Sequence, residues 1–126
     1  MKILVVDDLP NITRVISKYL NAKGHSCITS TSGKEGLELI KKKKFDVVLL
    51  DLDMPEVSGF DIIDEVENDV RLKDCKIIVQ TAVNLTNTEI DNLYKKGVMW
   101  FVKKPLQLRE LLETIESVHS TIPISQ

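Results

Sequence analysis

The stretch LLDLDMPEVSG, from Leu49 to Gly59, decides how this chain is interpreted. An apolar run leads into it and ends at Asp51, and a second aspartate, Asp53, follows two residues later. Burying a carboxylate is costly unless it is paired with a cation or with hydrogen-bond donors. Two acids at the end of an apolar strand therefore point to a functional site.

Composition narrows the classes of protein that the chain can represent. Its 126 residues fit one domain with one core, since a chain of this length buries most of its unfolded surface. Its apolar runs are far shorter than the ~20 residues that span a membrane, and the start KILVV after Met1 is no secretion signal. We therefore expect a cytoplasmic protein without membrane insertion. A formal net charge of -2 offers no field for direct nucleic-acid binding.

Five short apolar runs alternate with five helical patterns along the chain. The runs span residues 3–6, 27–29, 45–50, 76–80 and 99–102. Three of them are continuously apolar, which is typical of strands covered on both faces. Alternation of this kind predicts the α/β class: a doubly wound, five-stranded parallel sheet with right-handed crossovers.

The character of the runs also predicts the order of the strands. The first and third are the most apolar and hence central, whereas the second is short and rich in Ser and Thr, as an edge strand can be. This favours the flavodoxin-like order 2-1-3-4-5, with a ligand site beyond the carboxyl ends of the first and third strands. Between strands, Ser32 with Glu35 and Thr86 with Glu89 predict capping boxes at helix starts.

Acids stand at the ends of both central strands. Asp7 and Asp8 follow the first run, and Asp51 follows the third, with Asp53 just beyond. Two carboxylates about 5 Å apart repel by ~3 kcal/mol at an effective dielectric constant of about 20. A divalent cation would resolve this repulsion, and a set of oxygen ligands in an open site favours Mg²⁺, with Mn²⁺ able to substitute.

The remaining strand ends add groups that suit a phosphoryl ligand. Thr81 closes the fourth run with a hydroxyl, and Lys103, Lys104 and Pro105 close the fifth. A carboxylate beside a metal and a fixed cation can attack phosphorus and form an aspartyl phosphate. Taken singly, each acid could merely cap a helix or loop, but acids, hydroxyl and ammonium at four strand ends favour a site.

These motifs resemble the receiver domain of two-component response regulators, in a single-domain form like the chemotaxis regulators. The resemblance rests on VVDD at 5–8, LLDLDMPEVSG at 49–59, TA at 81–82 and GVMWFVKKP at 97–105. It covers residues 2–118, so we expect a receiver domain over 1–118. Residues 119–126 would form a polar tail or the start of a linker.

The resemblance implies a role for each acid. Asp51 would accept a phosphoryl group from a phosphohistidine donor, and Asp7, Asp8 and Asp51 would bind Mg²⁺. Asp53 would contribute its backbone carbonyl to the metal. The chain would then be no conventional enzyme, since only its own phosphorylation and dephosphorylation are expected.

The same resemblance implies how the phosphoryl group is held and sensed. Thr81, Ala82 and Lys104 would contact or support it, and the Lys104–Pro105 peptide bond is expected to be cis. Phe101 occupies the switch-aromatic position, where the ring would follow Thr81 inward on phosphorylation. An ordinary core position for Phe101 is an equally good interpretation.

Three residues depart from the usual pattern of the family. Asp53 and Val83 stand at positions that tune how fast water removes the phosphoryl group, and we expect them to set its lifetime. Trp100 would be an anchor on a partner surface formed by the fourth helix, fifth strand and fifth helix. Packing of Trp100 under the fourth or fifth helix is the alternative.

The implied partners are a sensor histidine kinase or a histidine phosphotransfer protein as donor, and a protein target that the sequence does not name. A homodimer that depends on phosphorylation remains an open option. The alternative function is a haloacid-dehalogenase-like phosphatase of small molecules, with Asp51 as nucleophile and Asp53 as general acid. That motif normally ends a first strand, whereas here it ends the third. A pseudo-receiver scaffold is the third alternative.

Overall fold

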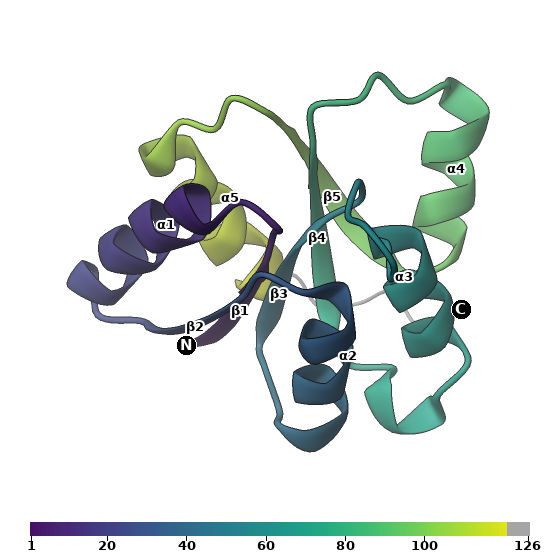
Figure 1. Cartoon of the computed structure of the whole chain (residues 1–126), viewed down its shortest axis with the longest axis horizontal. Coiled ribbons are helices and arrows are strands. Elements are labelled where there is room, and N and C mark those ends of the chain that lie inside the picture. The colour runs from purple at the N-terminus through teal and green to yellow at the C-terminus, as the bar shows by residue number, and fades with distance from the viewer. Residues whose placement is uncertain (121–126) are drawn as a thin grey trace.

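The structure is a computed structural model that describes residues 1–120. Strands and helices alternate along the chain (Figure 1). In chain order the elements are β1 (Lys2–Val6), α1 (Pro10–Ala22), β2 (Ser26–Ser30), α2 (Gly33–Lys42), β3 (Val47–Asp51), α3 (Gly59–Glu67), the 3-10 helix η1 (Val70–Leu72), β4 (Lys76–Thr81), α4 (Asn87–Lys95), β5 (Val98–Lys103) and α5 (Leu108–Ser120).

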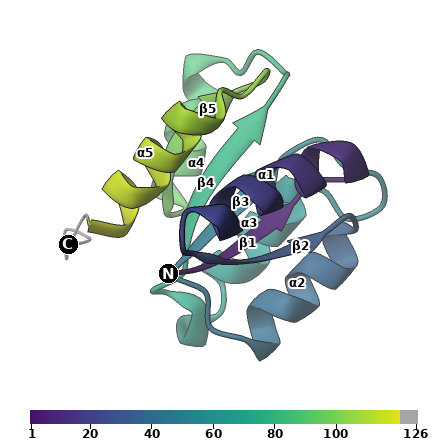
Figure 2. The ribbon, with the colours of Figure 1, turned by 90° about the vertical axis from the view of Figure 1, so that its left-hand side faces the viewer.

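The five strands form one parallel sheet in the order β2-β1-β3-β4-β5. Helices α1 and α5 cover one face, and α2, α3 and α4 cover the other (Figures 1 and 2). The predicted α/β class and strand order are therefore confirmed. The winding reverses between β1 and β3, and the loops that follow these strands meet at the carboxyl-terminal end of the sheet.

The two faces of the sheet bury separate clusters. Ile3 and Val5 of β1 pack with α1 and α5, whereas Leu4 and Val6 pack with α2, α3 and α4. Strand β3 alternates in the same way, and each of its residues is buried. Coverage on both faces explains why these two strands are continuously apolar.

Side-chain caps start three of the α-helices: α2, α3 and α4. The predicted capping box at Thr86 is present at the start of α4. Ser32 caps α2 by accepting the Glu35 N–H, but the second half of the predicted box is not formed within residues 1–120. A full box that the sequence analysis did not predict, Ser58 with Asp61, starts α3 directly after the loop that follows Asp51.

The edge strand β5 is the least regular part of the sheet. Its register with β4 shifts between Ile77 and Ile78, which pair with Val98 and Trp100. Trp100 is 53% exposed, so more than half of its surface is not covered by a helix. Helix α5 continues to Ser120, and the rest of the predicted tail, residues 121–126, lies outside the described part of the chain. Within residues 1–120, the helices are too short or too polar to cross a bilayer.

Candidate functional site

Three carboxylates meet where the two central strands end. Asp7 directly follows β1 and Asp51 is the last residue of β3, so both continue the face that packs on α1 and α5. Asp7, Asp8 and Asp51 each present an oxygen, and these oxygens lie within 4.8 Å of one another. Asp7 and Asp51 are buried and Asp8 is half-buried, so the cluster opens to one side.

Lys104 reaches this cluster from the loop after β5. Its Nζ lies 2.8 Å from Asp7 Oδ2 and 3.5 Å from Asp51 Oδ2. The side chain is only 13% exposed. Its backbone N–H donates to the carbonyl of Thr81, which ties this loop to the end of β4, and the Lys104–Pro105 peptide bond is cis as predicted.

The charges in the site shift the pKa values of its members. Burial raises the pKa of Asp51, and the charge of Asp7 adds to this; together they outweigh the Lys104 ammonium and the hydrogen bond from the Asp53 N–H. Burial would lower the pKa of Lys104, but its hydrogen bond to Asp7 and the charges of Asp7 and Asp51 raise it. The lysine therefore stays charged, and Asp51 holds a proton more readily than a free aspartate does.

Asp53 does not join the carboxylate cluster. Its side chain is exposed, and its backbone N–H donates to Asp51 Oδ1 over 3.4 Å. Three carboxylates therefore converge, and not the four that the sequence allowed. The Asp53 main chain nevertheless lies against the Asp51 carboxylate.

Thr81 ends β4 beside the cluster, on the opposite face from Asp51. It follows Val79 in the alternation and so faces the side covered by α3 and α4. Its Oγ1 accepts the N–H of Val83 at 3.0 Å, which forms a tight turn after the strand. Ala82 and Val83 are exposed on this turn at the rim of the site.

Phe101 lies on the same face of the sheet as Thr81. Its ring is half-buried and meets the Tyr94 ring of α4 edge-on, with centroids 4.9 Å apart. It also packs against the cluster on the α2, α3 and α4 side. Trp100 of β5 and Tyr94 of α4 are both exposed, so each of these two elements presents aromatic surface.

Gln80 is a member of the site that the sequence analysis missed. It is wholly buried, and its Nε2 donates to Asp7 Oδ2 at 2.8 Å. It is the Cα partner of Asp51 in the register of β3 with β4. The available signal was its polarity, because Gln80 follows the apolar residues Ile77, Ile78 and Val79 directly and precedes Thr81.

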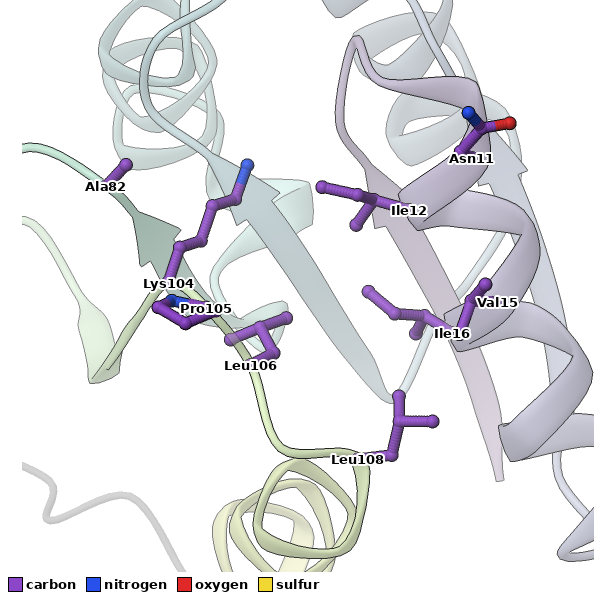
Figure 3. A pocket seen from close by; sticks show the side chains of 9 residues that line it. All are labelled: Asn11, Ile12, Val15, Ile16, Ala82, Lys104, Pro105, Leu106 and Leu108. Carbon is purple, nitrogen blue, oxygen red and sulfur yellow. The ribbon is translucent and has the colours of Figure 1, made fainter.

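An open apolar groove of about 640 Å³ begins beside Lys104. Figure 3 shows it between α1, which contributes Ile12 and Ile16, and the loop after β5, which contributes Pro105 and Leu106. The groove therefore gives an apolar surface directly next to the charged site.

The donor set fits a divalent cation. Three carboxylates and one ammonium leave a net charge of minus two, which one Mg²⁺ balances. The carboxylate oxygens are hard ligands, which Mg²⁺ prefers, and one side of the cluster is open for water or substrate oxygens.

Comparison with protein-family models identifies the domain. The model of the response regulator receiver domain matches residues 3–116. The chain belongs to this family.

Relatives of this receiver domain include full-length regulators and solved structures. Response regulator SaeR of Staphylococcus aureus is 35% identical over 118 residues, which are 92% of this chain and 49% of SaeR. The chain thus spans about half the length of that relative. Chemotaxis protein CheY4 of Vibrio cholerae superposes with a TM-score of 0.84 at 28% identity, covering 93% of this chain and 97% of CheY4.

A further solved relative of the receiver domain is response regulator TrrA of Thermotoga maritima, whose structure is a complex with Mg²⁺ and BeF. It has a TM-score of 0.78 and 32% identity, and covers 93% of this chain and 97% of TrrA. The phosphatase alternative is not favoured, since the matches are to receiver domains and the exposed Asp53 side chain stays outside the cluster.

Proposed function

We propose that this receiver domain takes a phosphoryl group onto Asp51 from a phosphohistidine donor and so acts as a switch in a His-Asp phosphorelay. The observation that carries the proposal is the position of the Lys104 ammonium. It contacts both Asp7 and Asp51 at the carboxyl-terminal end of the sheet, where three carboxylates converge. This arrangement combines a nucleophilic oxygen with a fixed positive charge, which phosphoryl transfer requires.

In the transfer, an ionised Asp51 oxygen attacks phosphorus and the donor imidazole departs with the electron pair of the P–N bond. Lys104 neutralises charge on the phosphoryl oxygens, and it lies close enough to Asp51 to do so after a small movement. Thr81 contributes its hydroxyl from the end of β4, and Ala82 follows it on the exposed turn, where its N–H is available as a further donor.

The metal requirement follows from the same cluster. Asp7, Asp8 and Asp51 would hold Mg²⁺ through their carboxylates and Asp53 through its backbone carbonyl. When bound, Mg²⁺ would supply positive charge toward the oxygens of the transferring group. Mn²⁺ also prefers oxygen ligands in an octahedral site and would substitute.

The switch would use the two groups that share a face of the sheet end. Thr81 would turn toward the phosphoryl group, which breaks its contact with the Val83 N–H, and Phe101 would follow into the space this leaves. Tyr94 packs on Phe101, so the movement would reach α4 and the exposed Trp100. Phosphorylation then biases two packings of one surface.

The partners follow from the chemistry. A sensor histidine kinase or a histidine phosphotransfer protein would be the donor, and its phosphohistidine must enter where the apolar groove meets Lys104. A protein target, or a second copy of the chain, would bind the surface of α4, β5 and α5. Two cysteines without a disulfide, Cys27 and Cys75, support a reducing cytoplasm as the compartment.

Intact-mass measurement tests the proposal. The chain is incubated with acetyl phosphate, with and without Mg²⁺, in parallel with the variants Asp51→Asn and Asp74→Asn. Asp74 is the control, because it is an exposed aspartate just before β4 and therefore lies at the amino-terminal end of the strands, away from the site. We expect one phosphoryl adduct that requires Mg²⁺, is absent from Asp51→Asn and remains in Asp74→Asn. Continued hydrolysis of the donor without an adduct would instead establish a phosphatase.

A further inference from the structure

Gln80 shares an acceptor with the lysine that handles the phosphoryl group. Asp7 Oδ2 accepts from Lys104 Nζ and from Gln80 Nε2, each at 2.8 Å. The other oxygen, Asp7 Oδ1, accepts the N–H of Leu9 at 3.0 Å. Asp7 is wholly buried, so these three donors stand in place of water around its carboxylate.

The orientation of the Gln80 amide is determined by this contact. A rotated amide would set Oε1 against a carboxylate oxygen and repel it, so Nε2 must face Asp7. Oε1 is then buried and has no hydrogen-bond partner within residues 1–120. Because an unpaired buried carbonyl is unfavourable, the amide is a poor choice if its purpose is stability.

During phosphoryl transfer, the contact between Asp7 and Lys104 must change. Lys104 lies nearer to Asp7 than to Asp51, at 2.8 Å against 3.5 Å. To follow the phosphoryl oxygens on Asp51, the ammonium must loosen its contact with Asp7. A buried carboxylate oxygen that loses a donor is costly unless another hydrogen bond to it remains.

We propose that Gln80 is a positioning residue that keeps Asp7 hydrogen-bonded while Lys104 moves from Asp7 to the phosphoryl group on Asp51. The inference rests on the proposed phosphoacceptor function and deepens it. Without the amide, Lys104 is the one remaining protein donor to Asp7 Oδ2 among the described residues, so the ammonium is held back from the reacting group.

The test is the substitution Gln80→Met, which keeps an unbranched side chain of similar length and removes the amide. The rate constant for phosphorylation of Asp51 by acetyl phosphate is measured at saturating Mg²⁺, and the dissociation constant for Mg²⁺ by calorimetry. We expect the rate constant to fall about tenfold, which corresponds to about 1.4 kcal/mol. The dissociation constant should change less than about threefold, since Leu9 and Lys104 still hold Asp7.

Stability separates this role from a structural one. Gln80→Met removes the unpaired Oε1 and the hydrogen bond from Nε2 together, and these two effects on stability oppose each other, so the urea midpoint should stay close to that of the wild type. Gln80→Leu removes the same amide with a branched side chain and should slow phosphorylation equally. Gln107→Met makes the same exchange at an exposed position and should change neither rate nor stability.

Each other outcome overturns the inference. An unchanged rate would show that Asp7 needs no second donor, and a deficit that disappears at saturating Mg²⁺ would assign Gln80 to metal binding. Variants that are less stable or unfolded would assign it to the fold. Failure of the wild type itself to form an adduct at Asp51 would refute the proposed function, which keeps the two failures distinct.

Discussion

Replacing Lys104 by methionine isolates the charge balance of the site. The ammonium contacts the carboxylates of Asp7 and Asp51, and its side chain is only 13% exposed. Methionine keeps the unbranched stem and removes the charge. In the absence of metal, the variant therefore holds the carboxylates of Asp7, Asp8 and Asp51 without the ammonium that contacts two of them.

The expected loss of stability in Lys104→Met can be calculated from distances in the site. At 4.8 Å, the largest separation within the cluster, one carboxylate pair repels by about 3.5 kcal/mol at an effective dielectric constant of about 20. Removing one partner of a buried ion pair costs about 3–5 kcal/mol. We expect Lys104→Met to lower the free energy of unfolding by about 3 kcal/mol at neutral pH, the lower end of this range, because the site is open to solvent on one side.

The loss should depend on pH with a definite sign. Without the lysine the pKa of Asp51 rises further above its ordinary 3.8, so between these two values the native state binds a proton that the unfolded state does not. Stability relative to the wild type therefore recovers as pH falls through the folded-state pKa of Asp51, and the deficit is full above it.

Urea unfolding followed by far-UV circular dichroism measures this deficit, at neutral and mildly acidic pH. Mg²⁺ at a hundred times its dissociation constant adds about 2.7 kcal/mol to either protein, and the variant should bind it more tightly. Lys103→Met is the matched control: this lysine is exposed, donates to Asn84 Oδ1, and should cost less than about 0.5 kcal/mol. A variant as stable as the wild type without metal, or a deficit that does not shrink on acidification, would refute the reasoning.

Four further substitutions probe the rest of the site and its surroundings. Asp53→Asn and Val83→Asn should each change the rate of dephosphorylation severalfold, as intact mass followed over time would record; unchanged rates would remove both residues from control of the lifetime. Trp100→Ala should alter the free energy of unfolding by less than about 1 kcal/mol, because the ring is 53% exposed, yet weaken target binding in a pull-down of the phosphorylated chain. Gly59→Ala should cost about 1–3 kcal/mol in urea unfolding, because a Cβ would lie 2.3 Å from the Asp51 carbonyl oxygen; full stability would show that α3 can shift freely.

Most of the fold was predictable because it depends on patterns along the chain. Continuous apolar runs at β1 and β3 identified the central strands. The acids that follow these runs located the site at the carboxyl-terminal end of the sheet, between the two strands where the winding reverses. Lys104 and its cis bond to Pro105 were predictable from the motif. The capping box of Ser58 was overlooked, although the spacing Ser58 to Asp61 is visible in the sequence.

Other features depend on distances across the sheet, which no local pattern contains. Trp100 lies on the edge strand β5 and is exposed, and nothing in MWFV distinguishes an exposed from a buried tryptophan. Likewise, Asp53 resembles Asp51 in the sequence, but the chain leaves the sheet after Asp51 and carries the Asp53 carboxylate away from the cluster.

The class of fold, the order of the strands and the group of residues that meet at the strand ends could all be predicted from the sequence, because hydrophobic periodicity and parallel winding are local rules. The contacts among these residues became visible in the folded chain. It gave Asp7 two donors on one oxygen, placed Gln80 opposite Asp51, and set Lys104 closer to Asp7 than to the proposed phosphoacceptor. Such pairings follow from strand register and loop packing, in which residues far apart in the chain come within hydrogen-bonding distance.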